Sequence, residues 1–179
     1  MNWLLIPAVF CLASFCWAMQ CHFVRGGKFT RGMTVTVLAG LLSTALHLTG
    51  LARHQAGWPL VALLLYAAAA ALFWSAIRAT RGAGLTACFL GQTARQVVTR
   101  GPYRRIRHPF YTAYSLVWLA GYVATLWWPT AVAFAVMLLL YVKAARAEER
   151  DWLGGEQWEE YAAYVRQTGG LLPRLTKKT

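Results

Sequence analysis

Apolar residues occur along this chain in long unbroken runs rather than at alternate positions. A helix that crosses the hydrocarbon core of a membrane needs roughly 20 such residues, with about 17 to 25 tolerated. Five runs approach this length, over residues 3–24, 33–52, 58–77, 109–127 and 129–145. The pattern therefore predicts an all-α, polytopic membrane protein with about five transmembrane helices.

The connections between these runs differ greatly in length. Only Trp128 separates the last two runs, and a tight turn at Trp127, Trp128 and Pro129 predicts a helical hairpin. The connection over residues 78–107 is far longer than usual between packed helices. Long connections of this kind are often functional. We therefore divide the chain into a scaffold of three spans, residues 1–77, and a catalytic region, residues 78–179, which holds the long loop, the hairpin and the tail.

Lysine and arginine predict the orientation in the membrane. Residues 25–31, 78–107 and 143–179 together carry seventeen of the 18 basic residues, which places these connections in the cytoplasm. The N-terminus is then outside and the C-terminus inside, in the inner or plasma membrane if the protein is bacterial. The net charge of +12 is mostly this topology signal. We expect anionic lipid headgroups rather than nucleic acid as partners, since no basic soluble domain is evident.

The first run has neither a preceding basic residue nor a small-residue cleavage site, so we expect a retained span rather than a signal peptide. Cysteines 11, 16, 21 and 88 have neither a metal-ligand nor a disulfide spacing, and we expect them to pack. His47 lies inside a span, where it is either a functional group or a neutral histidine hydrogen-bonded between helices.

Polar chemistry is concentrated in two short segments. All six acidic residues lie within residues 148–160, and residues 101–111 bring Arg104, Arg105, Arg107 and His108 to the start of the fourth run. The hairpin returns the chain to the same membrane face, so the two segments should meet. Pro109 disfavours helical geometry at His108, which predicts an extended turn there.

The two neighbouring glutamates of the acidic segment point about 100° apart on a helix, so we expect only one of Glu148 and Glu149 to face a site. Glu149 also lies three residues after Arg146, a spacing typical of an ordinary helical ion pair. Arg104 and Arg105 fit a cytoplasmic anchor and a functional role equally well.

Several linked motifs resemble the isoprenylcysteine carboxyl methyltransferase family, over residues from about 92 to 175. The pattern Gly-x-Tyr-x-x-x-Arg-His-Pro-x-Tyr enters a span, a hairpin follows, and the tail carries Arg-x-Glu-Glu and Tyr-x-x-Tyr before a proline. In this chain the residues are Gly101, Tyr103, Arg107, His108, Pro109, Tyr111, Arg146, Glu148, Glu149, Tyr161, Tyr164 and Pro173. The Phe-Gly pair usual before the first tail tyrosine is replaced by Gln157-Trp158.

The resemblance implies a membrane enzyme that takes S-adenosylmethionine from the cytosol and a lipid-like or small acceptor from the bilayer. It implies that Arg107 and Arg146 lie nearer the acceptor. A carboxylate acceptor, as in isoprenylcysteine, is the first expectation and needs no general base, whereas an amine or thiol needs His108 or a glutamate as base. The residues implied at the cofactor site are Val98, Thr99, Tyr103, His108, Pro109, Tyr111, Glu148 and Glu149.

Two other interpretations remain open. Some sterol-reductase-like membrane enzymes that use a nicotinamide cofactor also carry Arg-His-Pro-x-Tyr before a terminal hairpin, usually with asparagine where this chain has Phe110. Alternatively, the chain is a non-catalytic scaffold whose basic loops bind anionic lipid. A scaffold predicts that replacing His108 or Glu148 has no effect, and it leaves the paired motifs unexplained.

Overall fold

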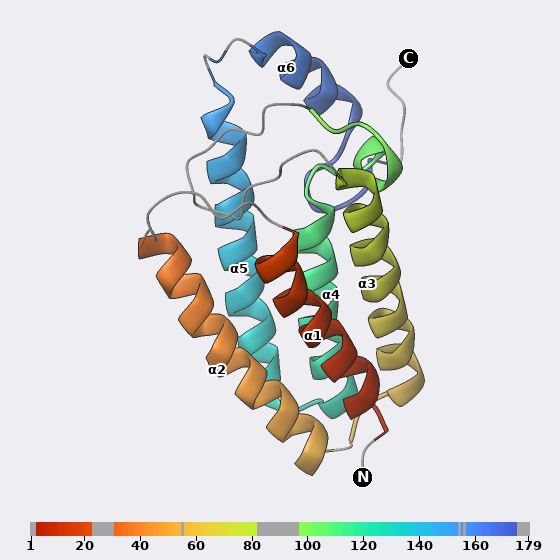
Figure 1. Cartoon of the computed structure of the whole chain (residues 1–179). Coiled ribbons are helices and arrows are strands. Elements are labelled where there is room, and N and C mark those ends of the chain that lie inside the picture. The colour runs from red at the N-terminus through yellow and green to blue at the C-terminus, as the bar shows by residue number, and fades with distance from the viewer. Residues whose placement is uncertain are drawn as a thin grey trace.

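The structure, a computed structural model, describes residues 3–22, 31–54, 56–81, 97–153, 155 and 157–174. The described residues form five long helices and a shorter sixth one. Figure 1 shows the long helices lying along the length of the molecule and the shorter one at one end. A short 3₁₀-helix, η1, precedes the fourth long helix. Their bounds are α1 Leu5–Cys21, α2 Arg31–Arg53, α3 Pro59–Thr80, η1 Gly101–Arg104, α4 Pro109–Thr125, α5 Trp128–Asp151 and α6 Trp158–Gln167.

Prolines and a left-handed residue set several helix boundaries. Three helices begin at or next to a proline, which fits the first turn because its missing N–H needs no partner there; these are Pro59, Pro109 and Pro129. Helix α4 ends at Leu126, whose φ of 47° is left-handed and whose N–H bonds to Tyr122 O. The Thr125 and Thr130 hydroxyls then meet at 2.9 Å across the turn. The predicted α4–α5 hairpin is therefore present.

Three of the five predicted spans are long and apolar enough to cross a membrane: α2, α3 and α5, with 23, 22 and 24 residues. Helices α1 and α4 have 17 residues each, at the short end of what crosses a hydrocarbon core. The first predicted span is shorter than expected within the described residues, and Val24 lies outside them. Helix α5 continues to Asp151, past the predicted limit at Ala145, so its last turns lie beyond the apolar segment.

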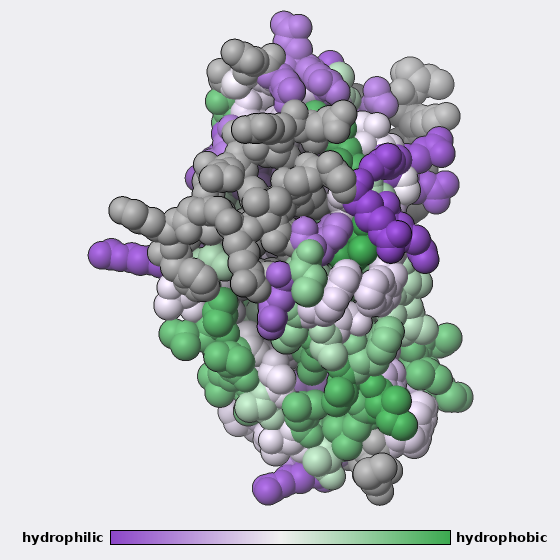
Figure 2. All heavy atoms as spheres, viewed as in Figure 1, coloured by the Kyte–Doolittle hydropathy of each residue, from purple (hydrophilic) through white to green (hydrophobic). Residues whose placement is uncertain are grey.

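The sides of the bundle are apolar. Exposed side chains include Ile6, Leu41 and Leu64, at 71%, 65% and 69% exposure. Figure 2 shows hydrophobic residues over much of the bundle on this face, while many hydrophilic ones gather at the end where α3 and α5 finish. An apolar belt of this kind is expected of side chains that face lipid.

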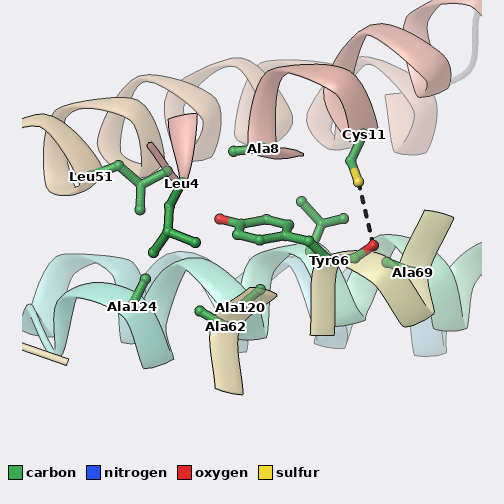
Figure 3. Close-up of a cluster of buried hydrophobic side chains, with 10 residues drawn as sticks. Leu4, Ala8, Cys11, Leu51, Ala62, Tyr66, Ala69, Ala120 and Ala124 are labelled. Atoms are coloured by element: carbon green, nitrogen blue, oxygen red, sulfur yellow. Dashed lines mark hydrogen bonds between the residues drawn. The ribbon is translucent and has the colours of Figure 1, made fainter. Parts of the chain in front are cut away.

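Small residues and buried hydrogen bonds join the helices inside the bundle. Figure 3 shows Leu4, the N-cap residue of α1, and Ala8 and Cys11 of α1 pointing toward Tyr66 of α3 and toward the alanines of α3 and α4. The Tyr66 hydroxyl lies 2.7 Å from Nε2 of His47, which is 1% exposed. Of the two possibilities for His47, the structure thus contains the hydrogen bond between helices.

Candidate functional site

The segment before α4 is fixed against the end of α3. Gly101 has a φ of 59°, and a Cβ added to it would lie only 2.9 Å from the Ala79 Cβ, so this position favours glycine. Helix η1 follows, with Tyr103 buried, and His108 is the N-cap residue of α4. The ψ of 62° at His108 is non-helical, as expected before Pro109. This residue therefore lies in a defined turn at the start of α4.

The C-terminal segment pairs with this turn through its backbone. Gly169 N–H donates to Arg105 O at 3.0 Å and Arg107 N–H donates to Gly169 O at 2.8 Å, which makes a parallel bridge. The amide of His108 continues the pairing by donating to Gly170 O at 3.2 Å. The Thr112 hydroxyl also donates to Leu171 O at 2.6 Å. The tail is thereby held beside the start of α4.

The acidic end of α5 completes the cluster. His108 Nε2 lies 3.0 Å from Glu149 Oε1, and its Nδ1 lies 3.5 Å from Glu148 Oε2. Arg107 Nε donates to Glu149 Oε1 at 2.9 Å, and the Tyr111 hydroxyl donates to Glu148 Oε1. The two polar segments therefore meet, as predicted from the topology.

The expectation that only one glutamate faces the site is wrong. It treated the site as lying in one direction from α5, but the imidazole of His108 lies between the two carboxylates and offers one nitrogen to each. The side chains of Glu148 and Glu149 remain 38% and 29% exposed. Both carboxylates are thus bonded to the protein and still open to a ligand.

The charges in this cluster shift the pKa values of its members. Burial of His108 disfavours its charged form, but hydrogen bonds and charges from Glu148 and Glu149 outweigh burial and raise its pKa above 6.5. The hydrogen bond from His108, with further help from Arg107, overcomes burial and lowers the pKa of Glu149 to about 2. Burial raises the pKa of Tyr164 to about 12, so this phenol stays neutral. The contacts within the cluster therefore favour the charged forms of His108 and Glu149 together.

The two arginines expected near the acceptor have different surroundings. The Arg107 side chain is 13% exposed, and besides Glu149 it bonds the Thr168 carbonyl at 2.6 Å through Nη1. Its guanidinium therefore joins α5 to the end of α6. Arg146 is exposed on α5 and makes no ion pair with Glu149 within the described residues, so the ordinary helical pair suggested by the spacing is not what holds Glu149.

The remaining predicted cofactor residues surround this cluster in different ways. Val98 packs behind η1 against a cluster that includes Phe73 and Tyr103, whereas Thr99 is exposed. Pro109 is buried at the start of α4, and Tyr111 stacks between the rings of His108 and Tyr141. Cofactor contacts by these residues stay a prediction.

Several residues that shape the site were not predicted. An added Cβ at Gly169 would clash with the Leu172 carbonyl oxygen, so the bend of the tail depends on this glycine. Trp152 stacks on Tyr161 with ring centroids 4.6 Å apart. The Gly169-Gly170 pair is a turn signal that was available in the sequence, whereas nothing in the spacing indicated that Thr112 would bond the tail.

Comparison with known families gives one match. A family model described as phospholipid methyltransferase matches residues 58–155, which begin just before α3 and end just after α5. No curated protein and no solved structure matches the chain. The matched region contains His108, Glu148 and Glu149 and stops before the C-terminal segment that pairs with them.

Proposed function

The chain belongs to the phospholipid methyltransferase family, which includes membrane enzymes like isoprenylcysteine carboxyl methyltransferase, and on this premise we propose that it transfers a methyl group from S-adenosylmethionine to a lipid-like acceptor. The observation that carries the proposal is the cluster of His108 with Glu148 and Glu149 at the end of an apolar bundle. Such a place gives access to a water-soluble cofactor on one side and to a lipid on the other.

The two glutamates of the cluster suit this cofactor. The sulfonium, ammonium and ribose hydroxyl groups of S-adenosylmethionine all pair well with carboxylates. The side chains of Glu148 and Glu149 are partly exposed and could bind them. Glu149 meets Arg107 and His108 through Oε1, and its Oε2 makes no hydrogen bond to another described residue. S-Adenosylmethionine would supply a methyl group that is transferred by in-line displacement. The protein's main task is then to align the reactants and exclude water.

Arg107 and Arg146 have different roles in this proposal. Because the Arg107 guanidinium is bonded to Glu149 and Thr168, it positions the glutamate and the tail rather than binding an acceptor directly. Arg146 is exposed on the same helix as both glutamates, so it is the arginine that would orient an acceptor carboxylate. A carboxylate acceptor needs no proton removed, which suits a site where two carboxylates favour the protonated form of His108.

An amine or thiol acceptor would require a base. His108 is a poor candidate, since both of its nitrogens face carboxylates and its pKa is raised. Glu148, which accepts the Tyr111 hydroxyl and has the more exposed side chain of the two glutamates, is the better one. The two acceptor classes therefore predict different sensitivities to Glu148→Gln.

The proposed enzyme crosses the membrane with five helices, α1 to α5, with the N-terminus outside and the cofactor site in the cytoplasm. The short helices α1 and α4 pack within the bundle beside α3, which supports their crossing with it. The excess of basic residues on alternate connections supports the orientation.

A methyl-transfer assay tests the proposal. Purified protein in nanodiscs is incubated with S-adenosylmethionine carrying an isotopically labelled methyl group, together with lipid acceptors that end in a carboxylate, an amine or a thiol. Label should enter one class, with activity lost in His108→Ala and kept in Glu159→Gln, which changes an exposed residue of α6. Failure of every acceptor, together with oxidation of a reduced nicotinamide dinucleotide by a sterol-like lipid, would favour the reductase instead.

A further inference from the structure

Positive charge is concentrated at the junction of α3 and η1. No aspartate or glutamate precedes Glu148 in the chain, so α1, α3 and η1 carry no acidic side chain. The ion pairs of the described residues join only Arg107 and His108 to the two glutamates. Four arginines at the junction of α3 and η1 are exposed and form what we call the arginine face: Arg78, Arg81, Arg100 and Arg104.

The arginine face is held together by backbone contacts. Arg100 Nε donates to Ala79 O at 2.7 Å and its Nη2 donates to Arg81 O at 3.2 Å, so this side chain covers the end of α3. Arg81 is the C-cap residue of α3. Arg104 lies at the far end of η1, about 6 Å along its axis at roughly 2 Å per residue. Arg78, Arg81 and the Arg100 guanidinium thus lie at the end of α3, whose partial negative charge stabilises them. Arg104 directly follows Tyr103, which packs against α3.

Two tryptophans near the arginine face indicate its depth in the membrane. Trp74 precedes Arg78 by four residues on α3, so it lies one turn, about 6 Å, closer to the middle of the bundle on the same side. Its ring centroid is 5.4 Å from that of Trp17 on α1, whose side chain is 43% exposed. Tryptophan is enriched at the boundary between acyl chains and headgroups. The arginines therefore lie at headgroup level.

We infer that the arginine face binds an anionic phospholipid, with its phosphate among Arg78, Arg81 and Arg104 and its acyl chains along Trp17 and Trp74. Arginine suits a phosphate because its guanidinium can bond two oxygens at once. The depth of the tryptophans favours a lipid over a soluble anion, since a free phosphate gains nothing from an indole beside it. This binding does not depend on methyl transfer, because none of its residues belongs to the cluster around His108.

Native mass spectrometry of the detergent-purified full chain measures this binding directly. Phosphatidylglycerol and phosphatidylcholine are titrated against the protein and against a variant with Arg78→Gln, Arg81→Gln and Arg104→Gln. The matched control carries Arg150→Gln, Arg166→Gln and Arg174→Gln, which removes the same charge from exposed arginines of α5, α6 and the tail. The arginine-face variant should bind phosphatidylglycerol about tenfold more weakly or worse, while the control changes by less than about twofold.

Two further variants keep the test decisive. If the triple variant fails to fold, as judged by helical circular dichroism, Arg104→Gln alone should still weaken phosphatidylglycerol binding. Trp17→Ala should weaken lipid binding without changing any competition by inorganic phosphate. Equal loss in the two triple variants, no preference for phosphatidylglycerol over phosphatidylcholine, or full displacement of the lipid by millimolar phosphate would each overturn the inference.

Discussion

His47 and His108 are both enclosed by helices of the same bundle, yet their neighbours differ in kind. His47 is 1% exposed and meets the Tyr66 hydroxyl at 2.7 Å, with the Trp118 ring 5.6 Å away. The side chain of His108 is 9% exposed and meets two carboxylates, at 3.0 and 3.5 Å. The first contact lies among apolar helices, whereas the second group contains two carboxylates and lies at the end of those helices.

This difference explains why a polar residue in a span is a weak guide to function by itself. A hydrogen bond inside the bundle joins α2 to α3, and the His47 ring makes no other hydrogen bond to a residue that the structure describes. The carboxylates around His108 are costly to bring together, and they remain partly exposed. They can therefore give up a contact within the protein and bind a ligand instead. We therefore expect His47 to contribute to stability and His108 to contribute to cofactor binding.

The largest effect is expected from Glu149→Gln. This change removes the negative charge shared by Arg107 and His108, and hydrogen bonds to charged groups contribute about 1.5–3 kcal/mol each. Affinity for S-adenosylhomocysteine, measured by calorimetry, should fall by about 100-fold or more. Glu159→Gln is the control, since Glu159 is exposed on α6. Equal affinities in the two variants would remove Glu149 from the site.

A somewhat smaller loss is expected from Gly169→Ala. The added methyl group would clash with the Leu172 carbonyl oxygen and displace the tail from its pairing with residues 105–108. Cofactor affinity should fall by about tenfold, as for the loss of one or two neutral hydrogen bonds. In the control Gly155→Ala, the new Cβ has only an ordinary contact, 3.6 Å from Trp152 O. An unchanged affinity for Gly169→Ala would show that the tail is not part of the cofactor site.

Gly121→Ala should act on the other histidine and leave the cofactor alone. A Cβ at this position would clash with the His47 ring, and overpacking of this kind typically costs about 1–3 kcal/mol. The midpoint of thermal unfolding in detergent should fall, while the folded protein binds S-adenosylhomocysteine as before. Gly40→Ala serves as control, because its Cβ would meet only the Met137 Cε at 3.8 Å. Weakened cofactor binding in folded Gly121→Ala protein would break the division between the two histidines.

The smallest effect is the pH dependence of the charged cluster. Because the folded pKa of His108 is raised, its stabilising contribution is complete below 6.5 and is lost as the pH rises through the folded pKa. Glu149 has a lowered pKa, so its contribution is complete above 4.5 and is lost as the pH falls toward about 2. The difference in unfolding midpoint between the natural chain and His108→Asn should therefore shrink as the pH rises above 6.5. A difference that grows with pH would contradict a protonated His108.

Much of this arrangement could be predicted from the chain itself. The apolar runs indicate the helices, and the two tryptophans at 127 and 128 indicate the hairpin that brings Glu149 to the side of His108. Pro109 predicts the turn at His108 because its effect on the preceding residue is purely local. Local sterics and hydrophobic burial act within a few residues of the sequence, so a sequence pattern captures them well.

What the sequence did not predict depends on contacts between distant segments. The carboxylates of Glu148 and Glu149 both reach His108 because of where the ring lies between α4 and α5, which helix periodicity alone does not give. The bond from Thr112 to the Leu171 carbonyl joins residues 59 positions apart. The sequence pattern also missed the last turns of α5, from Ala145 to Asp151. These turns are polar, so hydropathy does not indicate that the helix continues through them.

The most direct measurement is calorimetric titration of S-adenosylhomocysteine into the detergent-purified protein, in parallel with His108→Ala and Gly121→Ala. We predict saturable binding of S-adenosylhomocysteine to the natural chain and to folded Gly121→Ala protein, and loss of this binding in folded His108→Ala protein. Absence of binding to the natural chain, or equal binding by all three proteins, would contradict the assignment of the cofactor site to the charged cluster around His108.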